Sequence, residues 1–399
     1  MKYLRKGYVG MFVMALMVML FAACGGGNGG GSGGSVVTAA AQQNVAGTNP
    51  APVTATPLPV PTPESTPEPE APQKVVVSVS TEGELRGAVV NASDTPTKIV
   101  LTTDIELYSN FVIPRGAEIT LASEGDVMFN LIAHRDMPTI SVERGGTLTI
   151  DGIGVTRIYG SYGSGVINLG MFIMNSGTIH NNVVRSDMLG AGVSNHDGTF
   201  IMNGGSVNNN TGSAWTGGVL NHGGTVTIND GTISENTTGG GGGGISNWTG
   251  TLIMYGGTIS NNSSLDGGGV LNQLASFTMN EGAIIDNVSE RNGGGVVNAH
   301  NFTMFGGIIS GNIAGDDGGG VRNSGTFTMH DGIINGNTAT SGGGVSTNPR
   351  GSLRTFNIYG GWVFDNEAET DSDFNFAGTF NNNIFNANDG AIGTGPPTN

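Results

Sequence analysis

The stretch Gly268-Gly-Val-Leu-Asn-Gln-Leu-Ala-Ser-Phe-Thr-Met-Asn-Glu-Gly-Ala-Ile-Ile-Asp-Asn287 recurs along half of the chain with its glycine, apolar and asparagine positions in place. Its plan is Gly-Gly-Val-x-Asn, a short spacer, and Phe-x-Met-x-x-Gly-x-Ile-x-x-Asn. In Phe-x-Met the apolar residues lie two apart, which is the period of a β-strand, so Phe277 and Met279 share one side and Thr278 faces the other. We expect Leu271, between Val270 and the asparagine, to face outward with Thr278.

The repeat returns with a steady period. Its first asparagine recurs at spacings of 27, 26, 26, 25, 26, 25 and 25 residues, and such regularity marks a solenoid. These positions form a first file: Asn168, Asn195, Asn221, Asn247, Asn272, Asn298, Asn323 and Asn348. The second asparagine forms a parallel file: Asn182, Asn210, Asn236, Asn262, Asn287, Asn312, Asn337 and Asn366. We expect both files to be structural ladders whose amides hydrogen-bond the backbone and one another along the axis.

The repeat is too rich in glycine, and lacks the 3.6-residue periodicity, for a helical solenoid. Stacking the units at ~4.8 Å would pair each strand with its copy in the next unit. The predicted fold class is therefore all-β: a right-handed parallel β-helix with three strands per turn. Each turn, which we call a rung, has 25 to 26 residues. Val270, Phe277, Met279 and Ile284 represent the four apolar files that fill the coil. A short helix after Thr81, with capping-box spacing to Glu84, is expected to cap its N-terminal end.

Composition limits the partners. The 399 residues carry a formal charge of −16, and only 12% of them are charged. No basic stripe is present for nucleic acid, so nucleic acid is excluded as a partner.

Residues 1–24 are typical of a secretory signal, because a basic start precedes an apolar run too short for a comfortable transmembrane span. The run ends Leu20-Phe-Ala-Ala-Cys24, which resembles the lipobox of bacterial lipoproteins, although Phe21 departs from its aliphatic preference. That resemblance implies lipid attachment at Cys24, the chain's one cysteine, and membrane association through this lipid. An ordinary signal peptide with an incidental cysteine is the alternative.

The chain divides into five predicted segments. These are the signal peptide 1–24, a Gly/Ser- and Pro-rich tether 25–73, an N-terminal cap with irregular rungs 74–162, regular rungs 163–366, and a C-terminal cap and tail 367–399. Glycine-rich and proline-rich stretches cannot bury a core, so the second segment is expected to hold the folded part away from the membrane.

The outward positions of the repeat hold none of the residues that hydrolysis of a glycosidic bond needs. Neither the position after the repeated valine nor the position between Phe and Met holds a carboxylate, so general acid/base hydrolysis has no paired acids. We predict no catalytic residues, no metal site and no cofactor. Asp316-Asp317 is interpreted as a solvated turn rather than a calcium site, and Arg322 as a surface residue. His196 and His222 follow file asparagines one rung apart, but no third metal ligand continues their file.

Thr278, Thr303 and Thr328 form a possible binding face. Regularly spaced hydroxyls on a flat sheet can bind carbohydrate. Ice-binding sheets usually carry two such files, and the motif shows one. The simpler alternative is the β-propensity of threonine.

The rung, together with the opening Ser80-Thr-Glu-Gly-Glu-Leu-Arg-Gly-Ala, resembles bacterial adhesin-like β-helix proteins of the broad pectate-lyase-like superfamily. The glycine and asparagine spacing is also similar to the repeats of chlamydial polymorphic outer-membrane proteins. The resemblance covers roughly residues 74 to 366 and implies a surface protein on the extracellular side of the cell envelope. The favoured function is a lipid-anchored, non-catalytic binding or spacer scaffold whose partner is a carbohydrate or a host or matrix protein. The alternative is a carbohydrate-active enzyme with its site between Asp104 and Tyr162.

Overall fold

The computed structural model describes residues 74–92, 95–185, 190–347 and 355–370, together with the backbone of 374–376 and 379–382. Segments 1–24, with Cys24, and 25–73 lie outside the described residues, as do Asn348 and most of 367–399.

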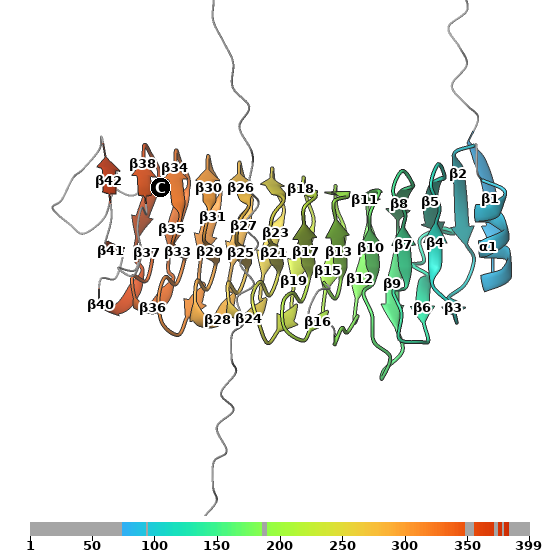
Figure 1. The fold of residues 1–399 in the computed structure, drawn as a ribbon, viewed down its shortest axis with the longest axis horizontal. Coiled ribbons are helices and arrows are strands. Elements are labelled where there is room, and N and C mark those ends of the chain that lie inside the picture. Colours follow the sequence, from blue (N-terminus) through green and yellow to red (C-terminus); the bar gives the residue numbers. More distant parts are fainter. Residues whose placement is uncertain are drawn as a thin grey trace, which may run out of the picture. The chain divides into compact units, whose positions relative to one another are not determined.

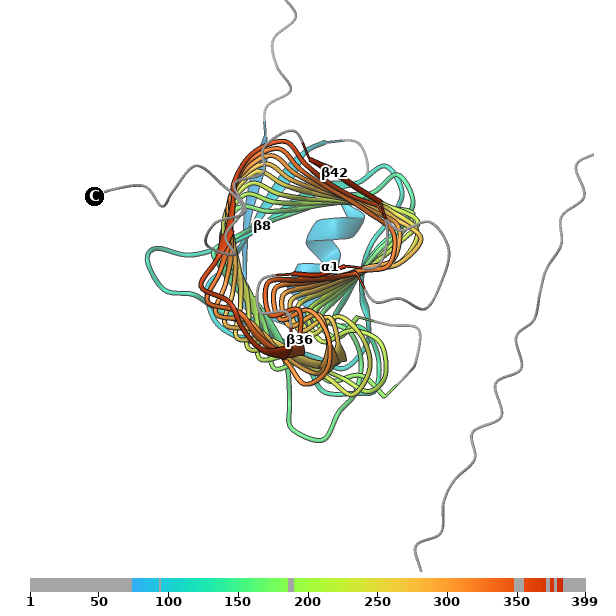
Figure 2. The same ribbon diagram turned by 90° about the vertical axis from the view of Figure 1, so that its left-hand side faces the viewer.

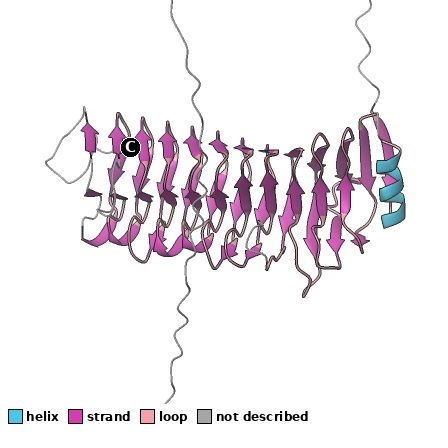
Figure 3. Ribbon diagram, viewed as in Figure 1, coloured by secondary structure: helices cyan, strands magenta, loops and turns pink. Residues whose placement is uncertain are grey.

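The described chain coils into about 11 turns, which confirms the parallel β-helix (Figure 1). Each regular rung passes in chain order through sheets that we call C, A, B and D, and every strand pair is parallel. Among the described residues α1 is the only helix (Figure 3). Seen along the axis, the rungs lie over one another and the strands of sheet D, marked by β36, form a lobe beside the main coil (Figure 2).

The strands described in each sheet are as follows. Sheet A contains β1 (Val75–Val79), β2 (Thr97–Leu101), β5 (Glu118–Ser123), β8 (Thr147–Asp151), β11 (Met171–Met174), β14 (Thr199–Met202), β18 (Thr225–Ile228), β22 (Thr251–Met254), β26 (Ser276–Met279), β30 (Asn301–Met304), β34 (Thr326–Met329), β38 (Thr355–Ile358) and β42 (Thr379–Asn382). Sheet B contains β3 (Ile105–Leu107), β6 (Asn130–Ala133), β9 (Ile153–Arg157), β12 (Gly177–His180), β15 (Ser206–Asn208), β19 (Thr232–Ser234), β23 (Thr258–Ser260), β27 (Ala283–Ile285), β31 (Ile308–Ser310), β35 (Ile333–Asn335) and β39 (Trp362–Phe364). Sheet C contains β4 (Phe111–Ile113), β7 (Ile140–Val142), β10 (Val166–Asn168), β13 (Val193–His196), β17 (Val219–His222), β21 (Ile245–Asn247), β25 (Val270–Asn272), β29 (Val296–Asn298), β33 (Val321–Asn323), β37 (Val345–Thr347) and β41 (Phe374–Phe376). Sheet D contains β16 (Thr211–Gly212), β20 (Thr237–Thr238), β24 (Ser263–Asp266), β28 (Val288–Asn292), β32 (Ile313–Ala314), β36 (Thr338–Ser341) and β40 (Glu367–Thr370).

Helix α1 (Glu82–Val90) lies at the N-terminal end of the coil, as the capping-box spacing predicts (Figure 1). Oγ1 of Thr81 accepts from N–H of Glu84 at 3.2 Å, and the Glu84 carboxylate accepts from N–H of Ser80 at 2.8 Å. Leu85 and Val89 join the core, so the helix covers the first turn of the stack. This arrangement confirms the predicted capping helix.

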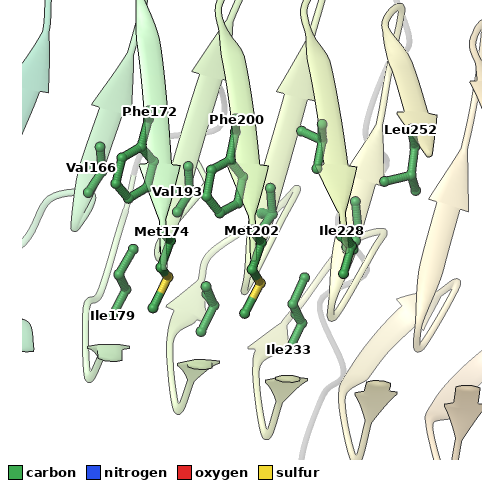
Figure 4. Packing of buried hydrophobic residues seen from close by; sticks show 14 of the residues in the cluster. Val166, Phe172, Met174, Ile179, Val193, Phe200, Met202, Ile228, Ile233 and Leu252 are labelled. Carbon is green, nitrogen blue, oxygen red and sulfur yellow. The ribbon is translucent and has the colours of Figure 1, made fainter. Parts of the chain in front are cut away.

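The apolar files run down the interior, as Figure 4 shows for the rungs around Phe172 and Phe200. Identical positions stand in register, for example Phe277 opposite Phe302 and Met279 opposite Met304. Neighbouring rings of Phe277, Phe302 and Phe327 stack with centroids 4.6 Å apart and planes within 5°. These side chains are at most 1% exposed, so the core is one continuous column of files.

Both asparagine files lie inside the coil as hydrogen-bonded ladders. In the first, Nδ2 of each residue from Asn168 to Asn298 donates to Oδ1 of the next at 2.7–2.9 Å. In the second, Oδ1 accepts from both Nδ2 and the backbone N–H of the preceding asparagine, at 2.9–3.0 Å, through Asn366. Members from Asn168 to Asn323 and from Asn182 to Asn337 are fully buried, so the ladders satisfy backbone groups that no water reaches.

The second ladder stands beside a recurrent tight turn. The residue before each of its asparagines has φ between 53° and 66°, a left-handed conformation that favours glycine. The position holds Gly311 and Gly336 in two rungs, whereas other rungs place Asn181, Asn209, Glu235, Asn261, Asp286 and Asp365 there. The fixed ladder therefore holds L-residues in a backbone conformation that they rarely adopt.

Two expectations for the rung are wrong. The prediction of three strands per rung missed sheet D, whose short strands lie in what the sequence presents as a spacer. The segment that leads from sheet D back to sheet C then covers the residue after the repeated valine: Leu220 and Leu271 are 4% exposed and Val297 is 6% exposed. Thus Leu271 does not face solvent, and Arg322 at the same position is half-buried, with Nη1 donating to Oγ of Ser324 at 3.0 Å.

Candidate functional site: the outer face of sheet A

The outer face of sheet A carries the threonines that the motif singled out. Thr278, Thr303 and Thr328 lie in register on β26, β30 and β34, and each is half-buried. The same file continues through Thr227 and Ile253 on one side and Asn357 on the other. Parallel pairing places neighbouring members at the rung spacing of ~4.8 Å.

A second polar file runs beside the first and was missed in the sequence. It occupies the first residue of each strand, two positions before the first file, and therefore shares its outward face. In register these residues are Thr199, Thr225, Thr251, Ser276, Asn301, Thr326 and Thr355. In the sequence these residues directly precede the repeated phenylalanine and fall in the spacer of the motif. The recurrence of threonine at this position is the signal that identifies them.

A third outward file follows the strands and changes character along the axis. Its early members Asn175, Asn203 and Asn229, which we call the amide segment, are exposed and joined by side-chain hydrogen bonds of 2.9 and 2.7 Å. Its late members Phe305, His330 and Tyr359 form what we call the aromatic segment. Their rings stack with centroids 4.7 and 5.1 Å apart and planes 10° and 16° apart.

The aromatic segment remains open to solvent. Phe305 is 48% exposed and Tyr359 is 49% exposed, and Tyr255 at the junction with the amide segment is 54% exposed. About half of the surface of Phe305 and of Tyr359 is therefore available to a ligand. From β11 to β38 no outward strand residue of sheet A is charged.

This arrangement suits a neutral sugar chain. Hydroxyl groups of threonine both donate and accept hydrogen bonds, as the hydroxyls of a sugar do. Exposed aromatic rings bury the apolar C–H faces of a sugar ring, and their polarised faces attract these hydrogens. The strand residues of the face therefore offer hydroxyl contacts at a repeating spacing without a charge that would have to be desolvated, and the aromatic segment beside them adds ring contacts.

The two histidines considered as metal ligands lie elsewhere, on sheet C. His196 and His222 occupy β13 and β17 with ring centroids 5.8 Å apart, and Nε2 of His196 lies 2.8 Å from Oγ of Ser194. Burial lowers the pKa of His196, and the neighbouring His222 lowers it further. Ser194 is fully buried and leaves no approach for a substrate.

Metal ligands do not converge. In the part of the chain that the structure describes, no group of three or more His, Cys, Asp or Glu side chains is placed to hold a metal ion. Asp316 lies exposed in a loop, where its carbonyl oxygen accepts from N–H of Ser341 at 3.0 Å. Asp230 and Asp331 accept from the N–H groups of Gly231 and Gly332 at 2.7 and 2.8 Å, which is a role in turn geometry.

Comparison with known proteins identifies no relative: no family model matches the sequence, and no curated protein and no solved structure matches it. The fold and its outer face define a parallel β-helix repeat protein. None of the helical segments described is both long and apolar enough to cross a membrane.

Proposed function

We propose that this protein is a non-catalytic binding scaffold, anchored on the outer side of the cell envelope through Cys24, whose sheet A face binds a neutral polysaccharide. The observation that carries the proposal is the outer face of sheet A, whose outward strand residues from β11 to β38 carry no charge, with its two polar files and a half-exposed, stacked aromatic segment. A long repeat scaffold suits this role, because contacts that are weak for one sugar add up along the chain.

The non-catalytic part rests on the chemistry of the described face. Glycoside hydrolysis uses two carboxylates roughly 5–10 Å apart across the scissile bond, and the outward strand residues from β11 to β38 include none. Ser194 and His196 lie within hydrogen-bond distance, as a nucleophile and its base would, but Ser194 is fully buried and no substrate can reach it. Release of reducing ends from polysaccharides by the purified protein, with or without calcium, would contradict the proposal and support the alternative of a carbohydrate-active enzyme.

The binding part is tested with the full chain in detergent micelles on an array of neutral polysaccharides. We expect the double variant Phe305→Ala/Tyr359→Ala to lose at least tenfold in affinity, because both exposed ring surfaces disappear. Tyr108→Ala is the matched control, since Tyr108 is a 50% exposed aromatic residue that follows β3 of sheet B and lies outside sheet A. Equal affinities for wild type and double variant would exclude sheet A as the binding face.

The anchoring part is tested separately. Metabolic labelling with a fatty-acid analogue is expected to mark the wild-type chain and to leave Cys24→Ser unmarked. Secretion of an unlabelled wild-type protein would favour the ordinary signal peptide.

A further inference from the structure

A pocket of about 560 Å³ lies away from sheet A, beside the N-terminal end of sheet D. One wall is the connection 157–162, which follows β9. The other comes from the turns of the next two rungs through Asn181, Val183, Asn209 and Thr211. Thr211 opens β16, the first strand of sheet D, and a parallel bridge pairs Val183 with it. The concavity therefore arises where the irregular rungs give way to the four-sheet repeat.

Two tyrosines give this pocket an aromatic lining. Tyr159 is fully exposed, and Tyr162 carries the guanidinium of Arg185 over its ring, with Cζ 3.6 Å from the centroid. Such a cation–π contact holds both the ring and the positive charge in place. The backbone is fixed as well, because N–H of Tyr162 donates to Oδ1 of Asp136 at 2.9 Å.

A buried positive charge forms part of the lining. Arg157 is 6% exposed, and its Nη2 donates to the carbonyl oxygens of Met137 and Ser164 at 3.1 Å. Its Nη1 is buried with no hydrogen-bond partner, and no carboxylate of the described residues forms an ion pair with it. Burial lowers the pKa of Arg157 to about 10, against an opposing effect of Asp136. The guanidinium remains charged at neutral pH, so it creates a positive potential that is only partly offset.

Neutral polar groups complete the lining. Asn181 and Asn209 occupy the left-handed turn positions, with φ of 55° and 54°, and Thr211 is exposed. Amide and hydroxyl groups of this kind orient a ligand, while an aromatic wall supplies contact area. The combination differs from sheet A, which offers rings and hydroxyls without charge.

We propose that this pocket binds one anionic monosaccharide unit, with its ring against Tyr159 and Tyr162 and its negative group drawn by Arg157 and Arg185. The charge contrast supports it: Arg157 lines a concave aromatic site, and Arg185 lies over the ring of Tyr162 in that lining, in a protein of net charge −16. Attraction in such a concave, partly desolvated place exceeds that on open surface. The site is independent of the proposed function of sheet A.

Calorimetry on the full chain tests the proposal with three probes: glucuronate, glucose 6-phosphate and the neutral methyl β-glucoside. We expect both anions to bind more tightly than the glucoside. Tyr159→Ala should weaken all binding at least fivefold, and Arg185→Gln should reduce the preference for the anions without abolishing it, because Arg157 remains. Arg157 is left intact because it holds carbonyl groups of the fold. Phe305→Ala/Tyr359→Ala on sheet A is the control and should change nothing.

Thermal unfolding of each variant is measured alongside, and both changed side chains are exposed, so midpoints equal to wild type are expected. Absence of heat with either anion, an equal affinity for the neutral glucoside, or unchanged binding by Tyr159→Ala would overturn the proposal. If the wild-type protein binds no neutral polysaccharide but still prefers the two anions to the glucoside, the function proposed for sheet A is wrong and the pocket proposal stands.

Discussion

The interior of the coil and the outer face of sheet A are built on the same strands but follow different rules. Inside, Phe277, Phe302 and Phe327 repeat the same ring in the same place, and the asparagine ladders repeat the same amide. Outside, the third file changes from the amide segment to the aromatic segment within a few rungs. The interior positions keep the same residue from rung to rung because stacking requires it. The outward positions vary, and this variation is what allows them to select a ligand.

The largest expected effect is on the interior phenylalanine column. Phe302→Ala removes a ring that stacks on both neighbours and leaves a cavity, so unfolding free energy should fall by about 3–5 kcal/mol. Phe305→Ala, three residues further along, removes a half-exposed ring and should cost far less. Urea unfolding of the two variants compares them directly, and similar losses would break the distinction between inside and outside.

The buried ladder comes next. Asn262→Ala removes the acceptor for two groups of Asn236 and the donor for the carbonyl of Ile233, all buried. Buried groups without partners cost roughly 1–3 kcal/mol each, so we expect a loss of about 3 kcal/mol or more. Asn229→Ala in the exposed amide segment is the control and should stay within about 0.5 kcal/mol. The same urea series measures both, and a mild Asn262→Ala would show that water reaches the ladder.

A third comparison concerns two residues of one rung that the sequence placed on the same side. Leu271→Lys puts an ammonium under the segment that follows sheet D, and we expect a loss of about 2 kcal/mol because the long side chain can escape only in part. Thr278→Lys, at the half-buried outward position, should be nearly neutral. Thermal melts followed by circular dichroism distinguish them. Equal stability would restore the original outward assignment of Leu271.

The fourth prediction transfers the aromatic segment. Asn203→Phe/Asn229→Tyr places rings on the amide segment at the rung spacing, and we expect a threefold to tenfold gain in polysaccharide affinity, about 0.7–1.4 kcal/mol. Array or calorimetric binding measures it, with Asn203→Ala/Asn229→Ala as the control for loss of the amides. If the added rings leave affinity unchanged, the polar files rather than the aromatic segment determine binding.

The smallest effect belongs to the left-handed turn. Glu235 has φ of 56° where the corresponding residues of two other rungs are glycine, so Glu235→Gly should stabilise the fold by about 0.5–1 kcal/mol. Glu235→Ala serves as the control, because it loses the side chain and keeps the backbone strain. A melt in which alanine matches glycine would assign the effect to the glutamate side chain instead of the turn.

The period of the repeat was enough to predict the coil and its inward files, because both depend on spacings of two or about 25 residues within the chain. The terminal helix was predicted from a separate local signal, the capping-box spacing of Thr81 and Glu84. Sheet D escaped prediction because strands such as Thr237–Thr238 are two residues long and carry no apolar alternation. The burial of Leu271 followed from the same omission. In the opening rungs, Ile105–Leu107 and Asn130–Ala133 form strands of sheet B that the asparagine repeat does not mark.

The candidate site was only partly predictable. Thr278, Thr303 and Thr328 could be read from the motif, and the structure places them on the outer face of sheet A. His330 stacks between Phe305 and Tyr359 because all three occupy the position after a strand of sheet A. The residue type at this position differs from rung to rung, so the sequence pattern does not reveal the stack. The pocket near Arg157 brings three rungs together at an irregular junction, and no repeat encodes such a place.

The asparagine ladders also give the coil a polarity. In the second ladder, Nδ2 of each residue from Asn182 to Asn337 donates to Oδ1 of the next asparagine toward the C-terminal end, so the dipoles of these amides add along the axis much as peptide dipoles add along a helix. The negative end emerges at Asn182, where Nε of Arg157 donates to its oxygen at 3.4 Å. The Arg157 guanidinium thus lies at the negative end of the ladder. A rung stacked there in the opposite direction would place its asparagine oxygen against the oxygen of Asn182, with no donor between them.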